Sequence, residues 1–324
     1  MSHTEGERKI VTHFNKNKSA LPLRSTAIAL CSSLLLCRQA LATGQYETGV
    51  KIDPVFGLPV PPVNWDGGGV GQYDPVASGV AMWIYAAIFS CALLWGIAET
   101  IKTKSTIPLF LSLSGIPCIF AEIFLDIMGG VVYANTPDTI VISLMGRHFG
   151  WFLISAWSAY GGLFALASYK VFSKPHLNNK FIWFGLLIVC TGQTVFEETL
   201  GLFNGIYYYY GNQPLTPFTQ FPWWMIFATS GGVCLLSALV YRFNASLQGW
   251  KAVGIVIIAP FSFCGFMGLI SLPAWIAVNS ELPWLLTQVL GLMTIAAGLI
   301  AFALVMKLIL QREPFDLKGI GQAF

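Results

Sequence analysis

Seven separate apolar segments, each long enough to cross a lipid bilayer, constrain the fold of this chain more than any other feature. A helix needs about 20 apolar residues to cross roughly 30 Å of hydrocarbon, and it satisfies its own backbone polar groups while doing so. The 324 residues are 55% hydrophobic and only 10% charged, whereas soluble domains carry about 25% charged residues. We therefore expect an all-α membrane protein, a seven-transmembrane helical bundle over 76–310, with spans near 76–99, 107–129, 149–171, 181–203, 222–243, 252–273 and 284–309.

The residues ahead of the first span predict an export signal followed by an extended segment. A basic leader ends at Arg24, and the apolar run STAIALCSSLLLC that follows is too short to span a membrane but suits a signal peptide. Small residues at Ala40 to Ala42 fit signal-peptidase cleavage, so we expect a signal peptide over 1–42, with an uncleaved N-terminal anchor as the alternative. Residues 43–75 are rich in Gly and Pro and lack helical periodicity, which predicts an extracytoplasmic segment without a core of its own.

Basic residues are distributed unevenly between the two sides of the predicted bundle. One side holds only Lys51 and Arg147. Because basic residues accumulate in cytoplasmic loops, the other side and the tail over 311–324 are predicted to be cytoplasmic. The sequence thus predicts a multi-pass protein of the cytoplasmic (inner) membrane, with the mature N-terminus outside and the C-terminus inside. The ten basic residues of the cytoplasmic side are Lys102, Lys104, Lys170, Lys174, Lys180, Arg242, Lys251, Lys307, Arg312 and Lys318.

Acidic side chains gather near the outer ends of the second and fourth spans. Glu122 and Asp126 are four residues apart and therefore share one helix face. Glu197 continues a polar stripe that begins at Gln193, whereas Glu198 points about 100° away from that stripe. Ionisable groups inside a membrane are costly and usually face a cavity or one another. We therefore predict an outward-opening polar pocket between the second, third and fourth spans, lined by Glu197 and not by Glu198.

The third span and the segment after the fourth span bring further polar residues to the same level. Arg147 and His148 precede the third span, Asn204 extends the stripe of Glu197, and a run of four tyrosines follows. A protonated acid beside an ionised one is what general acid/base chemistry requires, for example to protonate an alkene or enol ether or to assist loss of water. The catalytic candidates are Asp126, Glu197, Glu122 and His148, and the substrate-binding candidates are Asn204, Tyr207, Tyr209 and Arg147.

Each of these residues also has a purely structural interpretation. Glu122 and Glu198 could be solvated near the lipid headgroups, and Asp126 could form a structural pair with Arg147. His148 could be an interfacial hydrogen-bonding residue, and the tyrosines an interfacial aromatic belt with at most two members facing the pocket.

Several other function classes lack their motifs in this sequence. The acidic cluster at the span ends contains one histidine, His148, and the sequence has no HxxxH, ExxH or CxxC pair, so it does not predict a metal site. The sequence also lacks a P-loop, a GxGxxG after a strand, and basic patches with interleaved aromatics, so we expect neither a nucleotide cofactor nor nucleic acid as a partner. The expected partners are the lipid bilayer and a hydrophobic small-molecule substrate or lipid.

Short motifs around the acidic span ends carry a family resemblance. FAEIFLDIMGGVVYAN at the end of the second span and GIYYYYGNQPLTPFTQFPWW after the fourth are the residues concerned. Over about 76–245 the chain resembles the AveC-like integral membrane proteins, a family named for a spirocyclase of macrolide biosynthesis. The resemblance implies an acid-assisted cyclase or dehydratase, of the lyase or isomerase type, acting on a lipophilic polyketide or terpenoid, with Asp126, Glu197, Tyr207 and Tyr209 as the positions carried over.

Two alternative functions remain open at this stage. The carboxylates on membrane helices are also similar to those of carotenoid hydratases and membrane-bound terpene cyclases, which protonate or cyclise apolar chains. The other alternative is a non-catalytic protein that binds a lipid or small ligand or serves as a subunit of a membrane complex. Acid chemistry would require Asp126 or Glu197 for turnover, whereas a binding role would tolerate the corresponding amides.

Overall fold

The computed structural model describes residues 75–133, 140–144, 147–174, 176–202, 207–218 and 221–320. All of these residues belong to one structural unit, over 45–324. The predicted signal peptide, the extended segment up to residue 74, and Asn204 lie outside the described residues.

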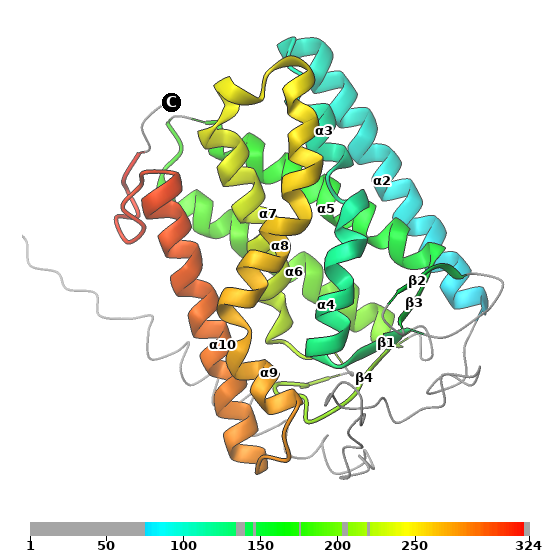
Figure 1. The fold of residues 1–324 in the computed structure, drawn as a ribbon. Helices are drawn as coiled ribbons and strands as arrows, with labels where there is room; N and C mark the ends of the chain where they lie inside the picture. The colour runs from blue at the N-terminus through cyan, green and yellow to red at the C-terminus, as the bar shows by residue number, and fades with distance from the viewer. Residues whose placement is uncertain are drawn as a thin grey trace, which may run out of the picture. The chain divides into compact units, whose positions relative to one another are not determined.

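Seven helical segments of the described chain are long and apolar enough to cross a membrane, which confirms the predicted seven-helix bundle (Figure 1). Their bounds differ from the predicted ones by only a few residues, because long apolar runs ending in polar or basic residues leave little freedom in where a span stops. The segments are Ser78–Thr103, Ile107–Gly129, Trp151–Phe172, Asn179–Glu198, Met225–Arg242, Gly249–Ile270 and Trp284–Ile309.

Within these spans the helices are divided into shorter elements. The α-helices are α2 (Pro75–Thr103), α3 (Ile107–Leu113), α4 (Ile119–Gly129), α5 (Trp151–Phe172), α6 (Asn179–Leu202), α7 (Met225–Arg242), α8 (Gly254–Ile270), α9 (Leu272–Val278) and α10 (Trp284–Leu304). Short 3₁₀ turns form η1 (Ile116–Cys118), η3 (Asn244–Leu247) and η4 (Gly249–Val253), and α10 ends in a single π turn, η5 (Val305–Ile309).

The helices differ in how much of their surface the rest of the protein covers. The most apolar stretch of α7 is 78% buried inside the protein, whereas the corresponding stretches of α2 and α6 are only 22% and 28% buried. In a membrane the uncovered apolar side chains face lipid, so α7 is the central helix and α2 and α6 are peripheral.

The second span is broken in the middle, between α3 and α4. Pro117 lies in η1, the 3₁₀ turn that separates α3 from α4. Gly115 and Gly161 allow α5 to approach this turn closely, because a Cβ added at Gly161 would lie 2.6 Å from the Gly115 Cα atom. Small residues commonly permit such backbone contacts between membrane helices. The close packing holds α4, which carries Glu122 and Asp126, against the interior of the bundle.

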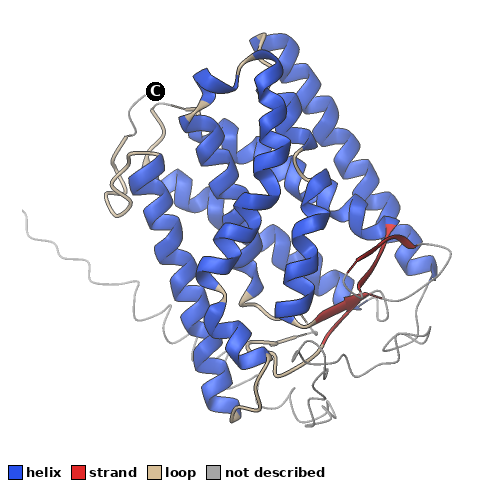
Figure 2. Ribbon diagram, viewed as in Figure 1, coloured by secondary structure: helices blue, strands red, loops and turns tan. Residues whose placement is uncertain are grey.

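Two short antiparallel ribbons lie at one end of the bundle, which we call the strand end (Figure 2). In the first ribbon, β1 (Val131–Tyr133), directly after α4, pairs with β4 (Tyr207–Tyr209), which follows α6. In the second, β2 (Ile140–Leu144) pairs with β3 (Arg147–Gly150), so the chain enters α5 from a strand. The β1–β4 ribbon therefore connects the strand-end termini of the second and fourth spans.

The opposite end of the bundle, which we call the tail end, is closed by the C-terminal segment. Asn179, at the start of α6, donates hydrogen bonds from its side-chain amide to the carbonyls of Glu313 and Asp316, 2.8 and 2.9 Å away. The buried Arg312 in turn donates to the Leu177 carbonyl and to the side-chain oxygen of Asn179. These contacts fix the segment after η5 against the loop between α5 and α6.

Candidate functional site

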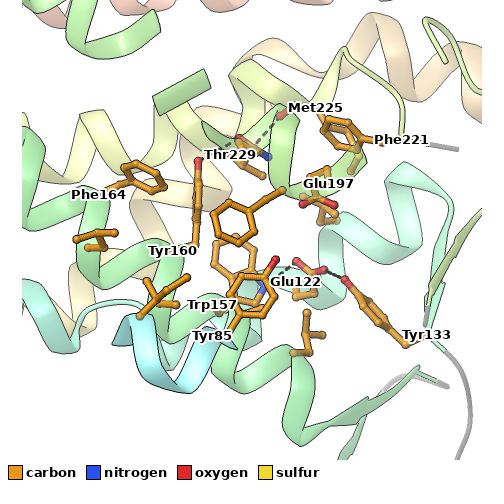
Figure 3. Close-up of a pocket in the computed structure, with 18 of the residues that line it drawn as sticks. Tyr85, Glu122, Tyr133, Trp157, Tyr160, Phe164, Glu197, Phe221, Met225 and Thr229 are labelled. Atoms are coloured by element: carbon orange, nitrogen blue, oxygen red, sulfur yellow. Dashed lines mark hydrogen bonds between the residues drawn. The ribbon is translucent and has the colours of Figure 1, made fainter. Parts of the chain in front are cut away.

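A cavity of about 190 Å³ lies among the helices near the strand end (Figure 3). Its wall includes residues from α2, α4, α5, α6 and α7 as well as from both strands of the β1–β4 ribbon. Most of the lining side chains are apolar or aromatic, and the glutamates are Glu122 and Glu197. Figure 3 shows the two glutamates on one side of the cavity, with Tyr160 and Phe164 on the other.

Glu122 is held in the cavity wall by two aromatic hydrogen-bond donors. The side chain lies on α4 and the residue is only 3% exposed. Its two carboxyl oxygens accept hydrogen bonds from the Tyr133 hydroxyl at 2.6 Å and from the Trp157 indole nitrogen at 2.9 Å. A buried carboxyl without such partners would be strongly destabilising, so these two bonds make its burial possible.

Glu197 on α6 is partly buried and is held by one aromatic donor. Its carboxyl oxygen accepts a hydrogen bond of 2.7 Å from the Tyr207 hydroxyl. The adjacent Glu198 lies outside the cavity wall, and it accepts a hydrogen bond of 2.8 Å from the Trp223 indole nitrogen. The two neighbouring glutamates therefore have different surroundings, as a rotation of about 100° per helical residue predicts.

The β1–β4 ribbon explains how both glutamates come to have a tyrosine partner. Tyr133 and Tyr207 are directly opposite each other in the two strands, and their ring centroids are 5.8 Å apart. The hydroxyl of Tyr133 reaches back to α4 and the hydroxyl of Tyr207 reaches back to α6. One cross-strand pair of aromatic residues thus positions two carboxyl groups from two different membrane spans.

Tyr209 adds a hydroxyl to the same side of the cavity. It lies on the same strand face as Tyr207, two residues away, and it lines the cavity. Burial, together with the negative charge of nearby carboxylates, raises the pKa of Tyr133, Tyr207 and Tyr209 well above the usual value of tyrosine. All three hydroxyls therefore stay protonated at neutral pH and act as donors. No described residue accepts a hydrogen bond from the Tyr209 hydroxyl.

Asp126 does not reach the cavity, although it was predicted to be part of the site. It is fully buried on α4, one turn closer to the strand end than Glu122, and it is absent from the cavity wall. Its carboxyl interacts with the Glu122 carboxyl but does not itself line the cavity. Because four residues advance a helix by slightly more than one turn, the two side chains share a face but diverge by about 40°.

The other predicted site residues are only partly described. Arg147 and His148 lie in β3, but their side chains are outside the part of the chain that the structure describes, as is all of Asn204. Tyr207 contacts Glu197 and does not itself line the cavity.

The predicted wall of three spans was incomplete, since α2 contributes Tyr85 and Ile88 and α7 contributes Met225 and Thr229. These side chains lie in otherwise apolar spans, where no charge marked them in the sequence.

A second polar group lies in the cavity wall away from the glutamates. The side-chain oxygen of Gln193 accepts hydrogen bonds from the Ser230 hydroxyl at 2.8 Å and from the Tyr160 hydroxyl at 3.1 Å. Gln193 is 4% exposed and lies one helical turn before Glu197 on α6. Its polar stripe with Glu197 was visible in the sequence, whereas its partners on α5 and α7 were not.

No family model, curated protein or solved structure matches this chain. The resemblance to AveC-like proteins therefore stays a prediction from short motifs. The fold and the cavity define a multi-pass helical membrane protein in which a buried glutamate, Glu122, and a partly buried one, Glu197, line the same cavity.

Proposed function

We propose that the cavity is a site for acid-assisted chemistry on a lipophilic substrate. The observation that carries the proposal is the placement of Glu122 and Glu197 in one wall, each held by neutral aromatic donors. Neither glutamate forms an ion pair with a residue that the structure describes. Carboxyl groups arranged in this way can exchange protons with a bound molecule, because no fixed positive charge commits them to the ionised form.

The two carboxyl groups can divide the two proton transfers of a cyclisation with loss of water. The protonated carboxyl donates its proton to a substrate hydroxyl, whose C–O bond breaks as the oxygen departs with the bonding electrons as water. A second hydroxyl of the substrate forms the new C–O bond and gives its proton to the other carboxylate. Two protons move and two carboxyl groups exchange roles, so one water is the only by-product. This is the reaction type that the resemblance to AveC-like proteins implies.

The size of the cavity limits which part of a substrate it can hold. An engineered cavity of about 150 Å³ binds benzene, whereas pockets for drug-sized ligands range from about 300 to 1,000 Å³. A cavity of about 190 Å³ therefore accommodates one ring or a short branched segment. We propose that the reacting segment of a polyketide or terpenoid enters the cavity while the rest of the molecule stays in the surrounding lipid.

The same proposal includes an orientation in the membrane. The ten basic residues named above belong to loops or helix termini at the tail end of the bundle, as the bounds of the spans require. Basic loops favour the cytoplasm. We therefore propose that the strand end, with the cavity, faces outward across the cytoplasmic membrane.

Two other functions retain support from particular observations. Protonation of an alkene, as in carotenoid hydratases and terpene cyclases, would use the same glutamates, and the largely apolar wall suits a hydrocarbon chain. A non-catalytic role in binding a lipid or small ligand is the other alternative. It is supported by the hydrogen bonds that hold both glutamates, because such bonds need no proton transfer to a substrate.

Mass spectrometry of products formed in deuterated water tests catalysis without knowledge of the substrate. The full chain, purified into lipid nanodiscs, would be incubated in deuterated water with a lipophilic extract of its native cells, and the products analysed by mass spectrometry. We expect species that lose one water or gain deuterium, and we expect them to be absent with Glu122→Gln and Glu197→Gln. Glu198→Gln, which changes the neighbouring residue outside the cavity, is the matched control and should leave product formation unchanged. Equal product formation by all three variants would contradict catalysis and support the binding role.

A further inference from the structure

The Gln193 side chain offers the cavity a hydrogen-bond donor that the proposed proton transfers do not use. Both hydroxyl groups near it, those of Tyr160 and Ser230, donate to its oxygen, and these two hydroxyls are also 3.1 Å from each other. An amide oxygen has two lone pairs, so this oxygen is fully occupied. The orientation of the whole amide plane is thereby fixed from two neighbouring helices.

The amide nitrogen of Gln193 has no such partner. No described residue accepts a hydrogen bond from it, although Gln193 is 96% buried and belongs to the cavity wall. The nitrogen points away from the oxygen across a rigid plane, and it carries two hydrogens that can donate. This nitrogen is not among the fully enclosed, unpaired polar atoms of the described residues, so it retains access to the cavity that Gln193 lines. A ligand oxygen in the cavity can therefore accept a hydrogen bond from it.

We propose that Gln193 is a second binding point of the cavity, where its amide donates a hydrogen bond to a carbonyl or ether oxygen of a lipophilic ligand. Side chains four residues apart on a helix lie about 6 Å apart, so this oxygen sits one helical turn from the group beside Glu197. The ligand is thus an oxygenated, ring-sized segment with an acceptor about 6 Å from its reacting centre. A pure hydrocarbon chain leaves the donor unsatisfied. The position of the reacting centre rests on the proposed function, whereas the oxygen site does not.

A matched pair of small probes tests the oxygen site directly. A gem-difluorinated cyclohexanone and its exocyclic-methylene analogue have nearly the same shape, and both are small enough for a cavity of this volume. Fluorine NMR would measure the affinity of each probe for the protein in nanodiscs, relative to its partition into empty nanodiscs. One neutral hydrogen bond corresponds to a preference of about three- to tenfold for the ketone.

Variants then assign the preference to a residue. Gln193→Met keeps the side-chain volume but removes the donor, so the ketone preference should disappear. Because this change leaves the Tyr160 and Ser230 hydroxyls without their acceptor, a second variant combines it with Tyr160→Phe and Ser230→Ala to remove the whole polar cluster. Glu198→Gln, outside the cavity wall, is the control and should retain the preference. Tyr209→Phe removes a hydroxyl donor of the cavity that has no acceptor among the described residues, and loss of the preference with this variant would assign the ketone to Tyr209 and overturn the inference.

The outcomes separate this inference from the proposed function. A ketone preference that is lost with both Gln193 variants and kept with Tyr209→Phe supports the oxygen site, whether or not any turnover is detected. Equal affinity of the two probes for the natural protein overturns it, as does a preference that survives in the Gln193 variants. Failure to form any dehydrated or deuterated product, with an intact ketone preference, would reject the catalytic proposal alone.

Discussion

The strand end and the tail end of the bundle both contain acidic residues, but they compensate for them in different ways. At the tail end, Glu99 of α2 forms an ion pair with Lys170 of α5, and Glu313 forms one with Lys307. At the strand end, Glu122 and Glu197 accept hydrogen bonds from tyrosine and tryptophan. A lysine partner keeps a carboxylate ionised, whereas a neutral donor allows it to gain or lose a proton.

The difference agrees with the proposal that Glu122 and Glu197, and not the acidic residues of the tail end, take part in chemistry. An ion pair at a helix end near water makes a small contribution to stability, and water solvates its charges without further protein partners. Buried carboxyl groups with neutral partners are costly to hold, and membrane proteins place them mainly where a substrate, ion or proton must be handled. The tail end therefore supplies matched residues for the cavity residues Glu122, Glu197 and Trp157.

The largest expected effect concerns turnover. Glu122→Gln and Glu197→Gln should each lower the rate of product formation by about 10²- to 10⁴-fold, because each removes a proton donor or acceptor. The double variant should be about as slow as the slower of the two single variants, since the two groups act as one unit. The matched change at the tail end, Glu99→Gln, should leave the rate unchanged. Initial rates of formation of the dehydrated or deuterated products measure all four, and an equal loss with Glu99→Gln would remove the distinction between the two ends.

The next effect concerns stability and uses two tryptophans with similar packing. Trp157 donates to the Glu122 carboxyl and packs edge-on against Phe263, whereas Trp183 donates to the Pro314 carbonyl and packs edge-on against Phe302. Hydrogen bonds to charged groups contribute about 1.5–3 kcal/mol and neutral ones about 0.5–1.5 kcal/mol. Trp157→Phe should therefore lower the free energy of unfolding more than Trp183→Phe, as measured by denaturant titration in mixed micelles. Equal losses would mean that Glu122 is uncharged when Trp157 binds it.

The sequence predicted the spans well, because a run of about 20 apolar residues has few structural alternatives. It also distinguished Glu197 from Glu198, since the helical rotation between adjacent residues is fixed. The residues that hold the glutamates were harder to find. Tyr133 and Tyr207 are separated by the third and fourth spans, and their pairing depends on how those spans pack.

The wall residues on other spans gave no signal in the sequence for a related reason. Tyr85 is one tyrosine in an apolar helix, and only the assembled bundle shows that it faces Glu197 across the cavity. Asp126 is buried outside the cavity wall, and a shared helix face could not specify which of the two acids lines the cavity. Periodicity defines faces of single helices, whereas a cavity wall is defined by several helices together.

A smaller effect is expected at the glycines that set the distance between helices. Gly161→Ala places a Cβ 2.6 Å from the Gly115 backbone, and overpacking of this kind costs about 1–3 kcal/mol. Gly185→Ala on α6 meets no other atom within 4 Å, so the better helix propensity of alanine should leave stability equal or slightly higher. Thermal unfolding in the same detergent compares the two variants. If Gly161→Ala were as stable as Gly185→Ala, the contact between α5 and the break in the second span would not be needed to hold Glu122.

The smallest effect appears only at alkaline pH and concerns Tyr209. Burial raises its pKa in the folded protein above the usual value of 10.0, so the folded state holds this proton more tightly than the unfolded state does. The stability that follows is fully present below about pH 10. It is lost as the pH rises towards the pKa of the folded state, by at most about 1.4 kcal/mol per pH unit for one group.

The melting temperature of Tyr209→Phe should therefore fall less steeply with rising pH above 10 than that of the natural protein, in melting curves taken at a series of pH values. Because no described residue accepts a hydrogen bond from this hydroxyl, the variant should retain most of its stability at neutral pH. Identical slopes above pH 10 would place the Tyr209 hydroxyl in water and would mean that the cavity is open to solvent at the strand end.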